Sequence, residues 1–291
     1  MAATKAAPQP QVGQAPTPQA KKVYDLKSFN QTITSPATQK YLSDLLHERK
    51  SAFVSNITAL VANNANLQKC EPCTLMFAAL KATALNLPID PALGMAHVVP
   101  YKNKNLGITE AQFQLGYKGF QQLALRTGQY KAINTTDVRQ GELGKRNRLT
   151  GEIEFNFIQD EKERLKAPVI GYVNYFRLIN GFESIYYMSK EEMEAHALQY
   201  SQTYRSQDAY TKSQSKWTTD FDGMARKTVI KLNLSKNGVL STELQDAIKA
   251  DQAVMRREND YEYADNDVQL SPIDQEKAKQ VAAKFENFDA E

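Results

Sequence analysis

The spacing of apolar residues changes in the middle of the stretch AQFQLGYKGFQQLALRTGQY, residues 111–130. Ala111, Phe113 and Leu115 alternate with glutamines, and this period of two is typical of a half-buried strand. After Gly116 the apolar positions recur at intervals of three and four residues, as they do on one face of a helix. The stretch therefore predicts a strand joined directly to a helix that begins near Lys118, with glycines at the junction.

The same two periods predict elements on both sides of this junction. Helical spacing covers about 37–66 and 73–87, and the second of these helices is expected to be mostly buried. Strand patterns follow over 94–101 and 110–116, so these strands and the next helix predict a ββα unit.

Further strands are predicted over 132–140, 152–158, 168–179 and 182–188. Asn180-Gly181 lies between the last two, and this dipeptide is a strong signal for a hairpin turn. Ser189 and Glu192 have the spacing of a capping box, which predicts a helix to about residue 199. A polar loop over 200–216 and a long helix over 217–234 follow. Together these elements predict an α+β fold with a mostly antiparallel sheet, a ββα-type core and flanking helices.

The two ends of the chain differ in composition from the part between them. Residues 1–22 contain four prolines and almost no large apolar side chain, so we expect a disordered tail over residues 1–35. Residues 251–291 contain 5 basic and 11 acidic residues, which indicates an acidic C-terminal tail. A single folded domain is expected between them, over residues 36–250.

Charge is also divided unequally along the chain, although the net charge is only +3. Residues 1–150 contain 18 basic and 8 acidic residues, whereas residues 151–291 contain 18 and 25. A basic body with an acidic tail indicates a polyanionic partner and a separate segment for protein interactions.

Several functional classes have no motif in this sequence. No apolar run approaches the roughly 18 residues of a membrane span, and no hydrophobic signal core is present, so we expect a cytoplasmic protein. Cys70 and Cys73 are the only cysteines and there are three histidines, which favours two reduced thiols over a metal or redox site. The phosphate-gripping GxxxxGK[ST] loop, GxGxxG after a strand and the nucleophile motifs are absent from the sequence, so we expect neither a cofactor nor an enzyme.

Two alternatives stay open. A metal-dependent nuclease would need carboxylates that converge from strands. Asp44 and Glu48 lie in a predicted helix, and Glu152 with Glu154 on one strand face is more typical of a solvated surface. The other alternative is an oligomeric scaffold that does not bind DNA, and the basic stretch from His97 to Thr150, with nine basic and three acidic residues, argues against it.

Binding of a polyanion is better supported. Lys118 and Arg126 lie opposite the apolar arc of their predicted helix, which is either a plain solvated face or a binding face. In the helix over 217–234 the aromatic and apolar residues form one stripe, for most of which core packing is expected. If that helix starts one turn earlier, one flank of the stripe carries Lys212, Lys216, Lys227 and Lys231. Cations beside aromatic residues suit single-stranded nucleic acid, and no recognition-helix pattern indicates duplex reading.

At these residues the chain resembles the RecT family of phage single-strand annealing proteins. The likeness lies in LGMAHVVPYKNK (93–104), FQLGYKGFQQLALRTGQ (113–129) and WTTDFDGMARKTVIK (217–231), in this order, and it covers most of the body from about 70 to 235. The blocks GYKG…LA.R.G and W…MARKT..K are specific in combination.

The resemblance implies an ATP-independent DNA-recombination protein that coats single-stranded DNA and promotes its pairing with a complementary strand. It also implies a homo-oligomeric ring or helical filament, a 5′-to-3′ exonuclease as partner, and a host single-strand-binding protein as a further candidate. The expected location is the cytoplasm of the bacterial host.

For the site we expect a groove that holds the sugar-phosphate backbone and leaves the bases free to pair. The residues expected to contact DNA are Lys102, Lys104, Tyr117, Lys118, Arg126, Lys212, Lys216, Arg226, Lys227 and Lys231. At the strand–helix junction, small glycines allow close approach of another backbone, and the first helical turn offers N–H groups to a phosphate. Tyr117 is expected to contact a base; the alternative is that it packs inward.

Overall fold

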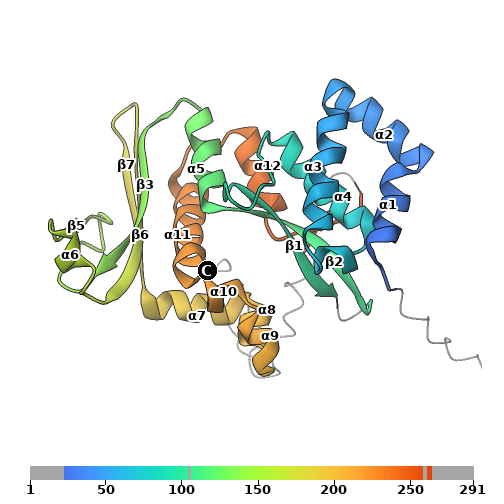
Figure 1. Ribbon diagram of the computed structural model, residues 1–291. Helices are drawn as coiled ribbons and strands as arrows, with labels where there is room; N and C mark the ends of the chain where they lie inside the picture. The colour runs from blue at the N-terminus through green and yellow to red at the C-terminus, as the bar shows by residue number, and fades with distance from the viewer. Residues whose placement is uncertain (1–22, 104–105, 258–260, 264–291) are drawn as a thin grey trace, which may run out of the picture.

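A computed structural model describes residues 23–103, 106–257 and 261–263 (Figure 1). Its strands are β1 (Ala96–Asn103), β2 (Ile108–Leu115), β3 (Tyr130–Arg139), β4 (Leu143–Arg146), β5 (Ile153–Phe155), β6 (Val169–Leu178), β7 (Glu183–Ser189), β8 (Val254–Met255) and β9 (Tyr261–Glu262). They form antiparallel sheets in the orders β1-β2-β8-β9, β3-β6-β7 and β4-β5. Together with the helices around them, these sheets confirm the predicted α+β fold.

The helices are α1 (Leu26–Thr34), α2 (Pro36–Leu46), α3 (Lys50–Ala62), α4 (Pro72–Ala84), α5 (Tyr117–Arg126), α6 (Glu161–Arg164), α7 (Lys190–Tyr200), α8 (Gln202–Arg205), α9 (Ala209–Ser213), α10 (Lys216–Thr219), α11 (Phe221–Asn237) and α12 (Thr242–Ala250). Short 3₁₀ turns, η1 (His47–Arg49) and η2 (Leu67–Lys69), connect the first helices. In Figure 1, α1 to α4 lie at one end of the molecule and β4, β5 and α6 lie at the other.

The ββα unit is confirmed. β1 and β2 pair without a bulge from Ala96 opposite Leu115 to Asn103 opposite Ile108, and α5 follows directly. The alternating residues Ala111 and Phe113 are fully buried, as is Leu115. β8 and β9 extend this sheet; they have two residues each, too short to show a period.

The glycines at the strand–helix junction admit a second backbone segment. The N–H of Gly116 donates to the carbonyl oxygen of Met95 at 2.8 Å. A Cβ atom on Gly116 would overlap the carbonyl group of Gly94, and one on Gly119 would overlap that of Met95. The junction therefore needs small residues because the chain before β1 crosses it, as the sequence predicted.

The second sheet contains the predicted hairpin. β6 and β7 pair antiparallel across Asn180-Gly181, where Gly181 has a φ of +89°, a value suited to glycine in a tight turn. The strand expected over 152–158 ends at Phe155 and forms a two-stranded sheet with β4. The predicted capping box of Ser189 and Glu192 is present at the start of α7.

Three predictions about helices need correction. The helix expected over 37–66 is interrupted at His47, where a φ of +48° ends α2. The polar loop 200–216 contains α8 and α9, and the long helix after it breaks at Asp220, whose side chain caps α11 through the N–H of Gly223. Capping side chains such as this one start a new helix and override the apolar period.

The predicted tails overlap with the folded part at both ends. Phe29 and Ile33 of α1 are buried in the main core, so the expectation of a disordered tail is wrong for residues 26–34. Asp251, Val254 and Met255, expected in the acidic tail, are also buried. Residues 1–22 and 264–291 lie outside the described residues.

Helix α11 occupies a central position between the two larger sheets (Figure 1). It packs against β3, β6 and β7 on one side and against α5 on the other. Its buried residues therefore belong to both core clusters: Ile230 and Leu234 pack with the β1–β2 side, and Ala225 and Val229 pack around Tyr172. This position brings the cations of α11 to the end of β2.

Candidate nucleic-acid interface

Four of the ten residues that the sequence predicted to contact DNA lie where the end of β2 meets α10 and α11. We call this group the lysine cluster; its members are Lys118, Lys216, Lys227 and Lys231. The Lys118 side chain lies beside Gly94: a Cβ atom added to Gly94 would be 3.8 Å from Lys118 Cδ. Gly94 in turn lies next to Gly116, and a Cβ atom added to Gly116 would be 3.2 Å from Nε2 of His97. The charges of Lys227 and Lys216 act on the same histidine.

A buried carboxylate fixes two members of the cluster. Lys227 Nζ donates to Asp251 Oδ1 at 2.9 Å, and Lys231 Nζ donates to Oδ2 at 2.7 Å. Asp251 Oδ1 also accepts from the N–H of Leu115 at 3.0 Å, at the end of β2. One carboxylate thus joins β2, α11 and the end of α12.

Burial and charge oppose each other at this carboxylate. Burial alone would raise the pKa of Asp251, but Lys227 and Lys231 outweigh it, so the pKa of Asp251 is lowered and the group is ionised. Only 8% of the Lys227 side chain is exposed, against 28% for Lys231. Lys231 can therefore reach a ligand from its pair, whereas Lys227 acts by holding Asp251.

Two histidines border the cluster and are predominantly neutral at pH 7. Burial lowers the pKa of His97, and the positive charges of Lys227 and Lys216 lower it further. Burial and Lys231 likewise lower the pKa of His196, whose ring lies 4.5 Å from that of Tyr200. The histidines add no charge of their own unless the pH falls.

These shifts predict that the protein loses stability in mild acid. Because the folded pKa values of His97 and His196 lie below the ordinary value of 6.5, the unfolded chain binds protons first as the pH falls. The urea midpoint should therefore be lower at pH 5.5 than at pH 7.5, a window in which ordinary carboxyl groups stay mostly ionised. A variant with His97→Gln and His196→Gln should show a smaller difference; an unchanged difference would assign the effect to other groups.

Tyr117 and Lys118 occupy the first turn of α5. Lys118 is exposed, while Tyr117 is half-buried and packs against the main core, so the inward alternative holds for part of its surface. The N-cap of the helix is Gly116, which has no side chain to bond the free N–H groups of that turn. The predicted apolar arc is confirmed, because Phe120 and Leu123 are buried.

Two other nominated residues lie away from the cluster. Arg126 is the last residue of α5, and its side chain caps the C-terminal end of α4. Its Nη1 donates to the carbonyl oxygen of Leu85 at 2.7 Å and its Nη2 to that of Asn86 at 2.8 Å. Lys102 is exposed, but strand alternation puts it on the same face of β1 as the buried Val98, opposite His97.

The other three cations that the sequence predicted to contact DNA are not part of the lysine cluster either. Arg226 faces the second sheet, where its Nη2 contacts Asp137 Oδ1 of β3 at 3.2 Å. Lys212 lies on α9 with its Nζ 5.2 Å from the ring centre of Tyr204, a cation–π contact. Lys104 lies outside the described residues. Trp217 packs in the second core cluster, as expected for most of the stripe on this helix.

The sequence did not predict two residues that shape the cluster. Asp251 was placed in the tail because the composition becomes acidic there, and its partners are 20 and 24 residues away. His97 is the second of these residues, and it was not among the residues expected to contact DNA. Its alternation with the buried Ala96 and Val98 could have shown that it faces away from the core.

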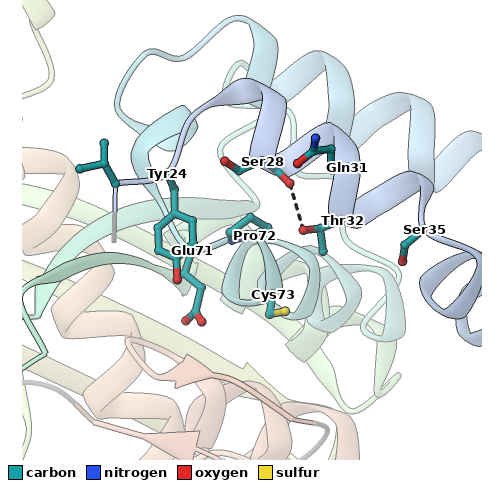
Figure 2. A pocket seen from close by; sticks show the side chains of 9 residues that line it. Tyr24, Ser28, Gln31, Thr32, Ser35, Glu71, Pro72 and Cys73 are labelled. Carbon is teal, nitrogen blue, oxygen red and sulfur yellow. Dashed lines mark hydrogen bonds between the residues drawn. The ribbon is translucent and has the colours of Figure 1, made fainter. Parts of the chain in front are cut away.

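The cysteines lie elsewhere: Cys70 is buried in the main core, and Cys73 lines an open cavity between α1 and α4 (Figure 2). Burial raises the pKa of Cys70 to about 12 and also raises the pKa of the exposed Cys73, so both are thiols and not thiolates at neutral pH. Tyr24 and Glu71 line the cavity with Cys73. Within the described ranges no group of three or more His, Cys, Asp or Glu side chains could hold a metal ion.

No helix in the described part of the chain has the length and apolar character needed to cross a membrane.

Comparison with known proteins places these features in a family. The model of the RecT family matches residues 51–267, which include α4, the ββα unit and α11. The uncharacterized protein YqaK of Bacillus subtilis (strain 168) is 44% identical over 216 residues, 74% of this chain and 69% of its own. Protein RecT of Escherichia coli (strain K12) is 28% identical over 251 residues, 81% of this chain and 83% of its own. Since the family model spans most of the chain, including the lysine cluster, this protein belongs to the RecT family.

Proposed function

We propose that this protein binds single-stranded DNA and promotes its pairing with a complementary strand without ATP. Membership of the RecT family implies a single-strand annealing recombinase and a protein that is not an enzyme. The lysine cluster is the observation that carries the more detailed proposal, because it concentrates positive charge next to the first turn of α5, where the side chain of Lys118 is exposed.

The charge of the cluster suits a phosphate backbone. Lys118 and Lys216 are exposed and form no ion pair with a carboxylate of the described residues, and Lys231 keeps part of its side chain in solvent. Asp251 cancels one of the four positive charges and faces the protein interior, so a net positive surface remains. In this proposal Lys118, Lys216 and Lys231 contact phosphates and the first turn of α5 donates N–H groups to one of them.

Other nominated residues take different roles in the proposal. Lys212 and Tyr204 extend the binding surface along α8 and α9, where Tyr210 exposes 74% of its surface and could stack on a base. Tyr117 contributes its exposed edge. Lys227 positions Asp251, while Arg126 and Arg226 stabilise the fold and Lys102 acts from the opposite face of the sheet.

Annealing follows from this binding mode. Cations that contact only the backbone leave the bases free, so complementarity is tested by Watson–Crick pairing and not by the protein. Neutralised phosphates also repel an incoming strand less. Repetition of the surface along a homo-oligomer, a ring or a helical filament, would hold the growing duplex through many weak contacts. The partner proposed for this role is a 5′-to-3′ exonuclease that exposes the strand, and a host single-strand-binding protein is a further candidate.

The test is annealing of two complementary labelled oligonucleotides in EDTA without ATP. We expect clear acceleration over the protein-free rate, and a log–log slope of DNA affinity against salt of roughly −0.7 for each phosphate contacted. With three contacting lysines the slope should be about −2 per subunit. Shortening of the DNA when Mg²⁺ is added would favour a nuclease instead. A folded protein that neither binds nor anneals DNA would favour the scaffold.

A further inference from the structure

A groove at the α1–α4 end of the molecule combines an apolar floor with a basic rim. It lies between α2, α4 and α12 and has a volume of about 340 Å³. Its apolar lining includes Leu45, Phe77, Leu80 and Met255. Leu45 is 42% exposed, although the other two leucines of α2, Leu42 and Leu46, are buried.

The described chain leads to this groove at its C-terminal end. Lys81 Nζ donates to Tyr261 Oη at 2.7 Å and also to Asp246, and Tyr261 Oη donates to the second oxygen of Asp246 at 2.7 Å. Tyr263 donates to the carbonyl oxygen of Lys249. These bonds attach β9 to the wall of the groove, so the described chain ends at its edge.

The sequence after Tyr263 carries an apolar stripe that matches the groove in kind. Ala278, Val281, Phe285 and Phe288 are separated by three, four and three residues, the spacing of one helix face. Ser271-Pro272 precedes them, a pair typical of the N-cap and first position of a helix.

Charge and length also fit. Residues 264–291 contain seven acidic and three basic residues, a net −4, whereas Arg49 and Arg257 stand at the rim of the groove. The 15 residues from 263 to 278 could span about 50 Å when extended, so the stripe can reach the groove within one chain.

We propose that residues 271–291 dock in this groove of their own chain as an amphipathic helix, with Val281, Phe285 and Phe288 covering Leu45 and Phe77 and the acidic residues facing Arg49 and Arg257. This is the helix-in-groove mode of recognition, with a covalently attached ligand. Docking keeps the acidic segment at the end of the molecule opposite the second sheet and gives it a defined seat from which a protein partner could displace it.

Disulfide cross-linking in the full chain tests the docking. In a Cys73→Ser background, Ala282→Cys on the segment is combined with Leu45→Cys in the groove. Ala282 borders the stripe, so the anchoring side chains stay in place. The control combines Ala282→Cys with Leu198→Cys on α7, because Leu198 is similarly exposed, at 46%, and lies on another element. Circular dichroism and the urea midpoint confirm that each variant is folded.

We expect the Leu45 pair to form an intramolecular, reducible bond at least about tenfold faster than the Leu198 pair, at a rate independent of protein concentration. Adding Phe285→Ala and Phe288→Ala should reduce the rate to that of the control. Equal rates for the two pairs would overturn the proposal, as would a rate that ignores the two phenylalanines. Cross-links formed only between two chains would show that the groove receives a second copy instead.

Discussion

Replacing Asp251 by Asn should lower the free energy of unfolding by about 3–5 kcal/mol, the cost typical of breaking a buried ion pair on one side. Asp251 is fully buried in its side chain, and Lys227, 8% exposed, would be left without a counter-charge. The asparagine amide oxygen can still accept the hydrogen bond from the N–H of Leu115, so the loss of stability measures the effect of removing the negative charge alone. Urea unfolding at pH 7.5 measures it.

Two further variants identify the cause of this loss. Adding Lys227→Met to Asp251→Asn should recover much of the stability, because no unpaired buried charge then remains. Glu183→Gln removes one partner of the exposed pair with Arg177, 44% and 43% exposed, and should cost less than about 1 kcal/mol. An Asp251→Asn protein as stable as the Glu183→Gln protein would contradict the view that this carboxylate holds the cluster together.

The combined change of Lys118→Ala and Lys216→Ala should weaken binding to single-stranded oligo-dT by about 25-fold at 0.1 M salt. Each phosphate contact on a single strand contributes a slope of about −0.7, which is a factor of about five at this salt concentration. The salt slope should become less negative by about 1.4. Fluorescence anisotropy across a salt series measures both quantities.

The matched control removes the same charge from distant exposed positions. Lys40 lies on α2 and Lys162 on α6, at opposite ends of the molecule in Figure 1, and both are exposed. Changing both to Ala should leave affinity near that of the unchanged protein, because exposed charges beyond a Debye length of about 10 Å are largely screened. An equal loss in the two double variants would mean that net charge, and not the lysine cluster, determines binding.

The sequence predicted the elements whose signals are local. The burial of Ala111, Phe113 and Leu115, the hairpin at Asn180-Gly181 and the capping box at Ser189 each follow from residues within a few positions of one another, and each is present in the structure. The expected exposure of the other face of β2 is wrong at Gln112, which is buried too. The glycines at 116 and 119 could likewise be interpreted as sites of close backbone approach, although not which backbone approaches.

The composition of the site was predicted less completely, because it depends on contacts between distant segments. Arg126 has the same local pattern as Lys118, yet it bonds carbonyl groups 40 and 41 residues away and ends a helix. Lys227 and Lys231 were expected to contact DNA, and the carboxylate that binds both of them comes after the next helix, α12. A helical wheel gives the direction of a side chain but not the residue from a distant segment that it contacts.

The position of Asp251 also sets where this chain can be shortened. Composition changes near residue 250, which would make it the natural place to cut, but the carboxylate that pairs with Lys227 and Lys231 comes directly after it. Val254, three residues further on, adds a strand beside Gln112. A truncated protein that ends at 250 would lose a counter-ion and a sheet edge together. The smallest independent unit must therefore extend into sequence that, judged by its charge, belongs to the tail.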